Sequence, residues 1–130
     1  MRAYLGRMPT QESNEDRIAL LQGTLDLLIL KTLALGPCHG QGVARLIQRQ
    51  SEETFFVDHG SLYLALQRLE DKGWIRAKWG VSDNNRKARF YSLTAKGRDH
   101  LVEKTSEWRR LTRAMALILD SNFGSVSEEA

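Results

Sequence analysis

Apolar residues recur at helical spacing through the first half of the chain and predict three helices there. The first runs from about residue 25 to 35, with Thr24 as its N-cap and the Gly36-Pro37 pair at its end. Its apolar residues cover almost the whole circumference, which is typical of a helix that is buried on more than one side. In a chain of 130 residues, we expect one face in the core and another, with Leu28, against a second subunit.

The second and third helices are amphipathic. The second spans about residues 41–50 and turns Val43, Leu46 and Ile47 inward. The third spans about residues 61–72, and at 100° per residue its core face consists of Leu62, Leu66 and Leu69. The opposite side and its flanks carry the residues that a ligand could reach: Gly60, Ser61, Tyr63, Leu64, Gln67, Arg68 and Asp71.

The helical spacing then changes to the alternation of a β-hairpin. Residues 74–81 place Ile75, Ala77 and Trp79 on one face and Arg76 and Lys78 on the other, which predicts a half-buried strand. Residues 82–85 have turn chemistry, because Asp and Asn tolerate positive φ. Residues 86–93 form the returning strand.

A long helix follows, from residue 95 to about 120, with Thr94 as its cap. It carries a seam with alternating spacings of four and three residues, made of Leu101, Thr105, Trp108, Thr112, Met115 and Leu119. Such a heptad seam usually packs against a helix of another chain. We therefore expect a dimer interface at Leu28, Leu101, Trp108, Met115 and Leu119.

These elements predict a mainly α fold with a small β-hairpin (α+β), in the layout of a winged helix-turn-helix. The expected organisation is a flexible arm at 1–16, the winged domain at 17–94, a dimerisation helix at 95–120 and a disordered tail at 121–130.

Charge is concentrated in the hairpin. Between Lys72 and Arg98 there are eight basic residues and one acid, Asp83, so this segment carries +7 in a chain of net charge +3. The remainder of the chain is therefore mildly acidic. Such a concentration favours a polyanionic partner, double-stranded DNA above all.

Other functional classes find little support. The longest apolar run, residues 27–30, is too short to span a membrane. The single cysteine, Cys38, fits a reducing cytoplasm, and His39, His59 and His100 lack metal-ligand spacing. The chain has no phosphate-binding loop or nucleophile motif. We expect neither an enzyme nor a cofactor.

Three motifs together resemble the PadR-like transcriptional regulators. They read LLQGTLDLLILKTLALGPCHGQGVARLIQ, then GSLYLALQRLEDKGWI, then RKARFYSLTAKG, and the resemblance covers about Leu20 to Leu119. It implies a winged helix-turn-helix with a C-terminal dimerisation helix, acting as a homodimeric regulator, most often a repressor. It also implies that a small molecule, often aromatic, lowers DNA affinity.

This sequence departs from the family pattern at one position. The family usually reads SLYPAL, whereas Leu64 replaces the proline here. On the predicted boundaries the position lies in the first turn, where proline is tolerated. We interpret the change as one of base preference.

The third helix is expected to enter the major groove. There Ser61 and Tyr63 would donate to phosphates, Leu64 would contact a thymine methyl group, Gln67 an adenine edge, and Arg68 a guanine or a phosphate. Arg86, Lys87 and Arg89 of the hairpin would contact the backbone or the minor groove, unless they serve only to keep an edge strand soluble. His39 either caps the second helix or contacts a phosphate.

Trp108 has two open interpretations. Thr105 and Thr112, one turn away on either side, would pack loosely across a dimer axis and leave a slot where a flat effector stacks between two indoles. The alternative is plain dimer packing.

The sequence therefore predicts a homodimeric repressor that binds a near-palindromic operator and is released by a small-molecule effector. The rival hypothesis is a dimeric winged-helix module that binds a protein and not DNA.

Overall fold

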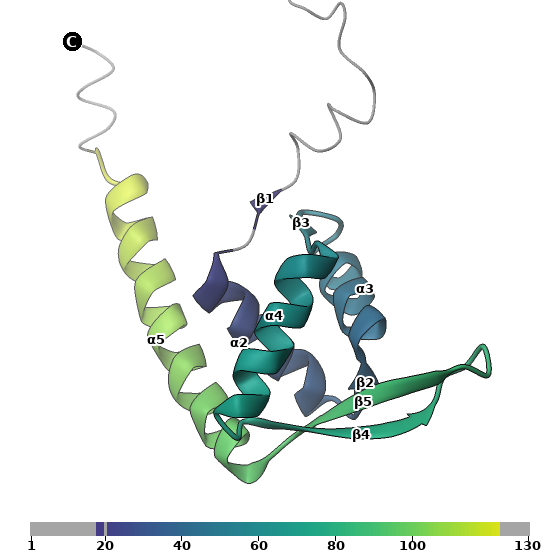
Figure 1. Ribbon diagram of the computed structural model, residues 1–130. Coiled ribbons are helices and arrows are strands. Elements are labelled where there is room, and N and C mark those ends of the chain that lie inside the picture. Colours follow the sequence, from purple (N-terminus) through teal and green to yellow (C-terminus); the bar gives the residue numbers. More distant parts are fainter. Residues whose placement is uncertain (1–17, 20, 123–130) are drawn as a thin grey trace, which may run out of the picture.

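The computed structural model describes residues 18–19 and 21–122, and it has the predicted architecture (Figure 1). Its helices are α2 (Gln22–Ala34), α3 (Gly40–Gln50), α4 (His59–Asp71) and α5 (Ala95–Leu119), and its long strands are β4 (Ile75–Val81) and β5 (Lys87–Leu93). Three two-residue strands complete it: β1 (Ile18–Ala19), β2 (Cys38–His39) and β3 (Phe55–Phe56). The arm predicted at 1–16 and the tail beyond residue 122 lie outside the described residues.

The start of α2 differs from the prediction. The helix begins at Gln22, after Leu21, whose backbone is extended and which makes no side-chain cap. Thr24 is therefore not the N-cap but lies within the first turn. The end agrees with the prediction, because Gly36 adopts a φ of 147° just beyond the helix.

The start of α4 also differs. Asp58 caps the helix, since its Oδ1 accepts a hydrogen bond of 2.8 Å from the Ser61 N–H. The helix consequently begins at His59, two residues earlier than expected, and Leu64 occupies its sixth position. Proline at this position would remove an i→i−4 hydrogen bond, so the first-turn argument for tolerance does not hold in this chain.

The core forms where the apolar stripes of the helices meet around α2, which contacts α3, α4, α5 and β5. The largest fully buried side chains are Ile29, Leu30, Val43, Leu62, Leu66 and Leu69. Burying each such side chain contributes about 1.5–3 kcal/mol. The predicted all-round burial of the first helix thus has an explanation within one chain, because α2 packs against partners on several sides.

A three-stranded sheet with the order β2-β5-β4 carries the wing (Figure 1). All pairs are antiparallel, and β4 and β5 pair from Ile75↔Leu93 to Val81↔Lys87. The turn closes with Asn85 at a φ of 62°, as its residue type predicts. Trp79 shares the face of Ile75 but is 62% exposed, because the hairpin extends past the helices that bury its base.

The predicted cap of the last helix is confirmed. Thr94 Oγ1 accepts from the Gly97 N–H at 3.0 Å and donates to the Gly73 carbonyl at 2.7 Å. A Cβ atom on Gly97 would overlap the Trp74 carbonyl oxygen, so α5 packs backbone to backbone on the base of the wing. No helix among the described residues is long and apolar enough to cross a membrane.

Candidate nucleic-acid interface

One side of α4 is buried and the other is open, as its periodicity predicts. Leu62, Ala65, Leu66 and Leu69 pack into the core. On the opposite side Ser61, Tyr63 and Gln67 are exposed, and Leu64 is 65% exposed. The open side therefore presents one apolar and several polar side chains to solvent.

Two of the predicted contact residues on α4 already have hydrogen-bond partners. Arg68 makes two hydrogen bonds to Asp26 of α2, from Nη2 to Oδ1 at 2.6 Å and from Nε to Oδ2 at 3.2 Å. The Ser61 hydroxyl donates to Asp58 Oδ2 at 2.9 Å. The DNA contact expected for Arg68 would require its ion pair to break, whereas Ser61 would only have to rotate its hydroxyl group.

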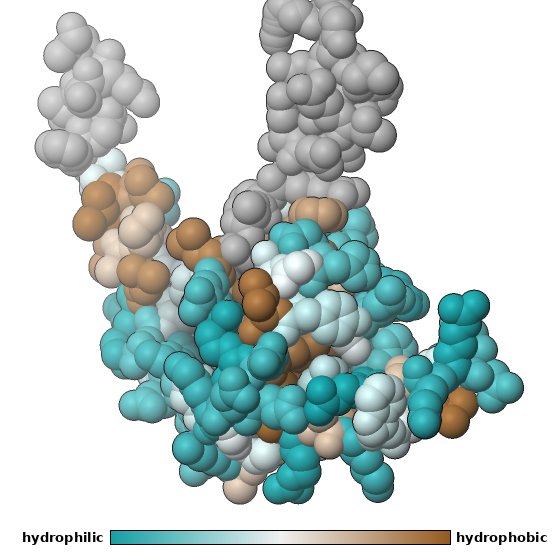
Figure 2. Space-filling model, viewed as in Figure 1, coloured by the Kyte–Doolittle hydropathy of each residue, from teal (hydrophilic) through white to brown (hydrophobic). Residues whose placement is uncertain are grey.

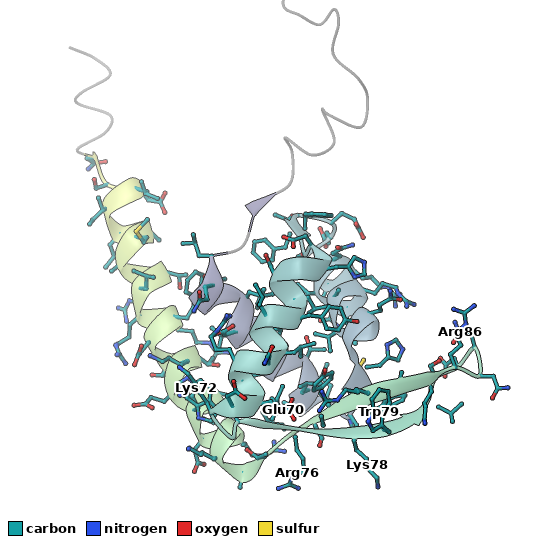
Figure 3. The ribbon with its side chains drawn as sticks, in the orientation of Figure 1. Glu70, Lys72, Arg76, Lys78, Trp79 and Arg86 are labelled. Carbon is teal, nitrogen blue, oxygen red and sulfur yellow. The ribbon has the colours of Figure 1, made fainter. Side chains whose placement is uncertain are left out.

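The wing displays the predicted basic residues on its exposed end. Arg86 lies at the tip (Figure 3) and Lys87 Nζ lies 5.8 Å from the Trp79 ring centroid. Arg89 Nη2 is 3.1 Å from Glu70 Oε2, an ion pair that connects the wing to α4. Arg76 and Lys78 point to the side of the sheet away from α4 (Figure 3).

A groove of about 540 Å³ lies between the wing, α4 and the start of α3. Five residues predicted to contact DNA line it: His39, Tyr63, Arg86, Lys87 and Arg89. Its lining also includes residues that the sequence analysis did not assign to DNA contact, among them Gln41, Arg45, Trp79 and the acid Asp83. The helical pattern indicates that Gln41 and Arg45 face outward, but nothing in that pattern shows that this face borders the wing.

His39 caps α3, one of the two roles considered for it. Its Nδ1 accepts a hydrogen bond of 3.1 Å from the Gly42 N–H, and its ring meets Phe90 edge-on at 5.6 Å between centroids. Because Nδ1 accepts, the neutral ring carries its hydrogen on Nε2. Next to it, burial raises the pKa of the Cys38 thiol, which disfavours the reactive thiolate.

The segment from the middle of α2 to the first turns of α5 identifies the protein family. Residues 29–103 match the transcriptional regulator PadR-like family, more than half of the chain. The chain belongs to this family. Its members are regulators of transcription and not enzymes, so this PadR-like protein is a winged-helix, DNA-binding regulator.

Individual relatives agree. A PadR family transcription regulator of Clostridium difficile R20291 is 32% identical, with a TM-score of 0.64 over 73% of this chain and 97% of its own. A transcriptional regulator of Clostridium thermocellum is 26% identical, with a TM-score of 0.66 over 72% and 88%. An uncharacterised protein of Lysinibacillus sphaericus is 27% identical over 104 residues, which is 80% of this chain and 95% of its own.

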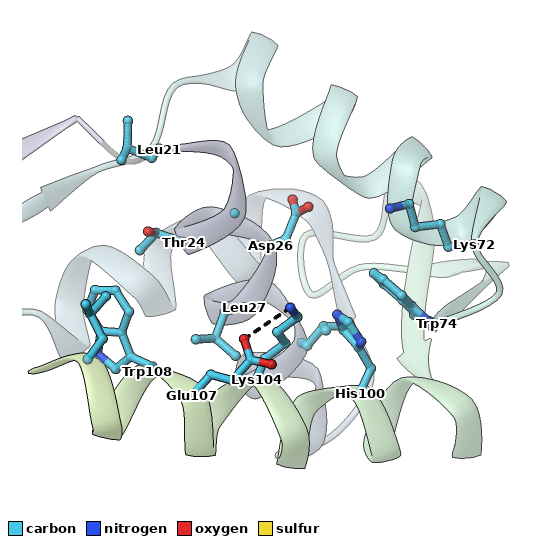
Figure 4. Close-up of a pocket in the computed structure, with 13 residues that line it drawn as sticks. Leu21, Thr24, Asp26, Leu27, Lys72, Trp74, His100, Lys104, Glu107 and Trp108 are labelled. Carbon is cyan, nitrogen blue, oxygen red and sulfur yellow. Dashed lines mark hydrogen bonds and ion pairs between the residues drawn. The ribbon is translucent and has the colours of Figure 1, made fainter.

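Two grooves flank α5 of this PadR-like regulator, and Trp108 and Leu27 line both. The first, about 680 Å³, also contains Asp26, Trp74 and His100 (Figure 4). The Trp74 and His100 rings stack there at 3.6 Å, and burial lowers the pKa of His100, with Lys104 adding to the effect. The second groove, about 760 Å³, contains Thr105. Thr112 is exposed and lines neither of these two grooves.

The predicted dimer seam divides into two parts. Leu101 is only 8% exposed and belongs to the core of its own chain, and Leu28 is half-buried against that core. The placement of Leu101 in a subunit interface is therefore corrected, because its own chain already covers it. Farther along α5, Trp108, Met115 and Leu119 are exposed. Apolar side chains gather at this end of the helix in Figure 2.

Proposed function

We propose that this PadR-like regulator binds a near-palindromic DNA site as a homodimer and represses transcription by occluding a promoter. The observation that carries the proposal is the shared groove. Tyr63 of α4, the start of α3 and the basic wing border a single concave surface, and Leu64 and Gln67 are exposed on α4 next to Tyr63, outside that lining. This arrangement fits a helix in the major groove with a wing on the adjacent backbone.

In the groove and on the exposed side of α4 next to it, the side chains divide by chemistry. Gln67 and Leu64 lie on the open side of α4 and would meet base edges, an amide for adenine and an apolar group for a thymine methyl. Tyr63, Arg86 and Lys87 would contact phosphates, and so would Arg45 of α3 and the Nε2–H of His39, which caps α3. We expect Arg89 to contribute less to phosphate binding than Arg86 or Lys87, because it is already paired with Glu70.

The homodimer would form through the exposed end of α5, with a contribution from α2. Leu111, Met115, Leu117, Ile118 and Leu119 are all exposed in the single chain. Such an apolar surface on a helix is stabilised when a second copy covers it. This assigns residues 17–94 to reading DNA and 95–120 to dimerisation.

A small-molecule effector would release the DNA. A flat aromatic molecule could stack between the two Trp108 side chains of a dimer, beside Thr105. Its binding would change the angle between the two reading heads through the dimer helices. The proposed cytoplasmic location follows from this role, because a repressor must reach the DNA that it binds.

Selection of bound sites from random double-stranded DNA tests the proposal. We expect a two-fold symmetric motif, with half-sites about one helical turn or a multiple apart. We also expect binding that weakens steeply with salt. Recovery of no enriched motif, together with salt-insensitive capture of a protein partner, would support the interaction-module hypothesis instead.

A further inference from the structure

Helix α4 has two different kinds of attachment to the rest of the domain. Its apolar stripe, Leu62, Ala65, Leu66 and Leu69, is buried in the core. Apolar burial is non-directional, so a stripe of this kind permits a helix to roll or slide slightly. The Asp26–Arg68 pair adds directional bonds, because a planar guanidinium bonded at two nitrogens accepts only one orientation.

The position of this ion pair lets it affect the orientation of the exposed side of α4. The two side chains are 25% (Arg68) and 18% (Asp26) exposed, so water screens the pair only in part. Arg68 follows Gln67 directly and lies one turn beyond Leu64, so rotation at Arg68 also rotates the open side of α4. Asp26 lies on α2, which packs against α5.

We propose that the Asp26–Arg68 ion pair sets the angle at which each subunit presents α4 to DNA, which makes both residues positioning residues. The inference rests on the proposed homodimeric binding of DNA. It assigns Arg68 a role that requires the ion pair to stay intact, in place of a direct base or phosphate contact.

The consequence concerns the two half-sites. In a two-fold dimer, the separation and rotation between the two α4 helices depend on how firmly each is held to α2 and α5. A firm attachment makes the protein sensitive to the number of base pairs between half-sites, since one base pair rotates a half-site by roughly 35°. A loosened α4 adapts to altered spacing while it reads the same bases.

The test measures the affinity of the full-length protein for its selected operator and for versions with one base pair inserted or deleted at the centre. For the wild type we expect a loss of about tenfold, or 1.4 kcal/mol, for either change. For Asp26→Asn we expect the loss to shrink to roughly threefold, or about 0.7 kcal/mol. The preferred bases within each half-site should stay the same in a repeated selection.

Charge effects are separated by a second variant. Asp26→Asn releases a guanidinium group beside the open side of α4 and should raise non-specific affinity. Arg68→Lys keeps the charge but loses the two-point geometry, and should show an intermediate spacing penalty. Glu107→Gln is the matched control, because it breaks an exposed pair with Lys104 (3.3 Å) in the wall of the groove that Asp26 also lines. It should keep the wild-type spacing penalty.

The outcomes are distinct. If Asp26→Asn melts cooperatively and keeps the wild-type spacing penalty, the positioning role is refuted while the proposed function stands. If Asp26→Asn does not fold, the same comparison is made with Arg68→Lys: a wild-type spacing penalty in that variant refutes the positioning role. If the wild type selects no two-fold symmetric site, the proposed function fails first.

Discussion

At the scale of single residues, hydrogen bonds within the chain already engage several polar side chains on or beside the surface proposed to bind DNA. Asp58 Oδ1 is bonded to the Ser61 N–H, His39 Nδ1 to the Gly42 N–H, and Arg68 to Asp26. Gln67 lies exposed in the middle of the open side of α4. Fewer polar side chains are therefore free to contact DNA than the number of polar residues on this surface indicates.

The cap of α4 makes stability depend on pH. The hydrogen bonds from Ser61 lower the pKa of Asp58 below its ordinary value of 3.8. The stabilisation is therefore present above pH 3.8 and is lost as pH falls through the lower, folded-state pKa. Asp58→Ala should lower the free energy of unfolding by about 1 kcal/mol at neutral pH.

Urea denaturation at pH 7 and in acid checks this prediction. Asp58→Asn is the control, because asparagine caps equally well but does not titrate. The wild type should lose more stability in acid than Asp58→Asn does. Equal losses would show that the cap contributes nothing to the acid response.

Specificity can be tested at Gln67. Because the side chain is exposed and the core stripe lies opposite, Gln67→Ala should melt like the wild type. It should relax the preference at one base pair of each half-site by about 1–3 kcal/mol. Site selection on both proteins measures this, and an unchanged motif at unchanged affinity would mean that the reading face is assigned wrongly.

At the scale of elements, the wing is a basic hairpin with two different faces. Lys87 and Arg89 are cross-strand partners of Val81 and Trp79 on the face that adjoins α4, and Arg86 is at the tip (Figure 3). Arg76 and Lys78 belong to the other face. Because side chains alternate along the strands, the basic residues of the hairpin lie on two faces. One face borders the groove, and the other points away from it.

This division predicts unequal effects on the salt dependence of binding. Arg86→Ala with Lys87→Ala removes two phosphate contacts per subunit, and each contact contributes about 0.9 to the slope of log K against log salt. The slope for the dimer should fall by roughly 3–4. Arg76→Ala with Lys78→Ala removes the same charge and should change the slope much less. Equal changes would indicate a general charge effect with no directed wing contact.

At the scale of the whole molecule, the two ends of α5 have different roles. Its first turns pack on the wing base through Gly97 and into the core through Leu101. Its last turns carry exposed apolar residues and extend beyond the winged domain (Figures 1 and 2). The single chain therefore buries its own core and still displays an apolar helix end.

The dimer prediction follows from that helix end. Met115→Glu with Leu119→Glu would place four carboxylates in one desolvated seam, so the dimer should dissociate. Light scattering at micromolar concentration should give a dimeric mass for the wild type and a monomeric mass for the variant. Val81→Glu, at an exposed apolar position of the wing, should remain dimeric. A monomeric wild type would contradict the prediction.

Periodicity and turn chemistry determined most of the architecture. The helical and the alternating spacings located the four helices and the hairpin of the described residues. Asn85 and Thr94 were assigned their local roles, and the exposed side of α4 was identified correctly. These features depend on residues within one or two turns of each other, so the sequence contains their causes. The pairing of β2 with β5 was missed, because a two-residue strand has too few positions to show alternation.

What only the tertiary structure decided involves residues that are distant in the chain. Asp26 and Arg68 are 42 positions apart, and Arg45 joins the groove of the wing only because α3 packs beside the hairpin. Leu101 fits a heptad seam by its spacing. It is nevertheless buried in the core of its own chain, because the first turns of α5 pack against that core. The sequence by itself therefore determined which residues are apolar, basic or capping. The packing of the helices around α2 decided which of them meet each other and which remain for DNA or for a second subunit, because burial and ion pairing depend on neighbours that local spacing does not specify.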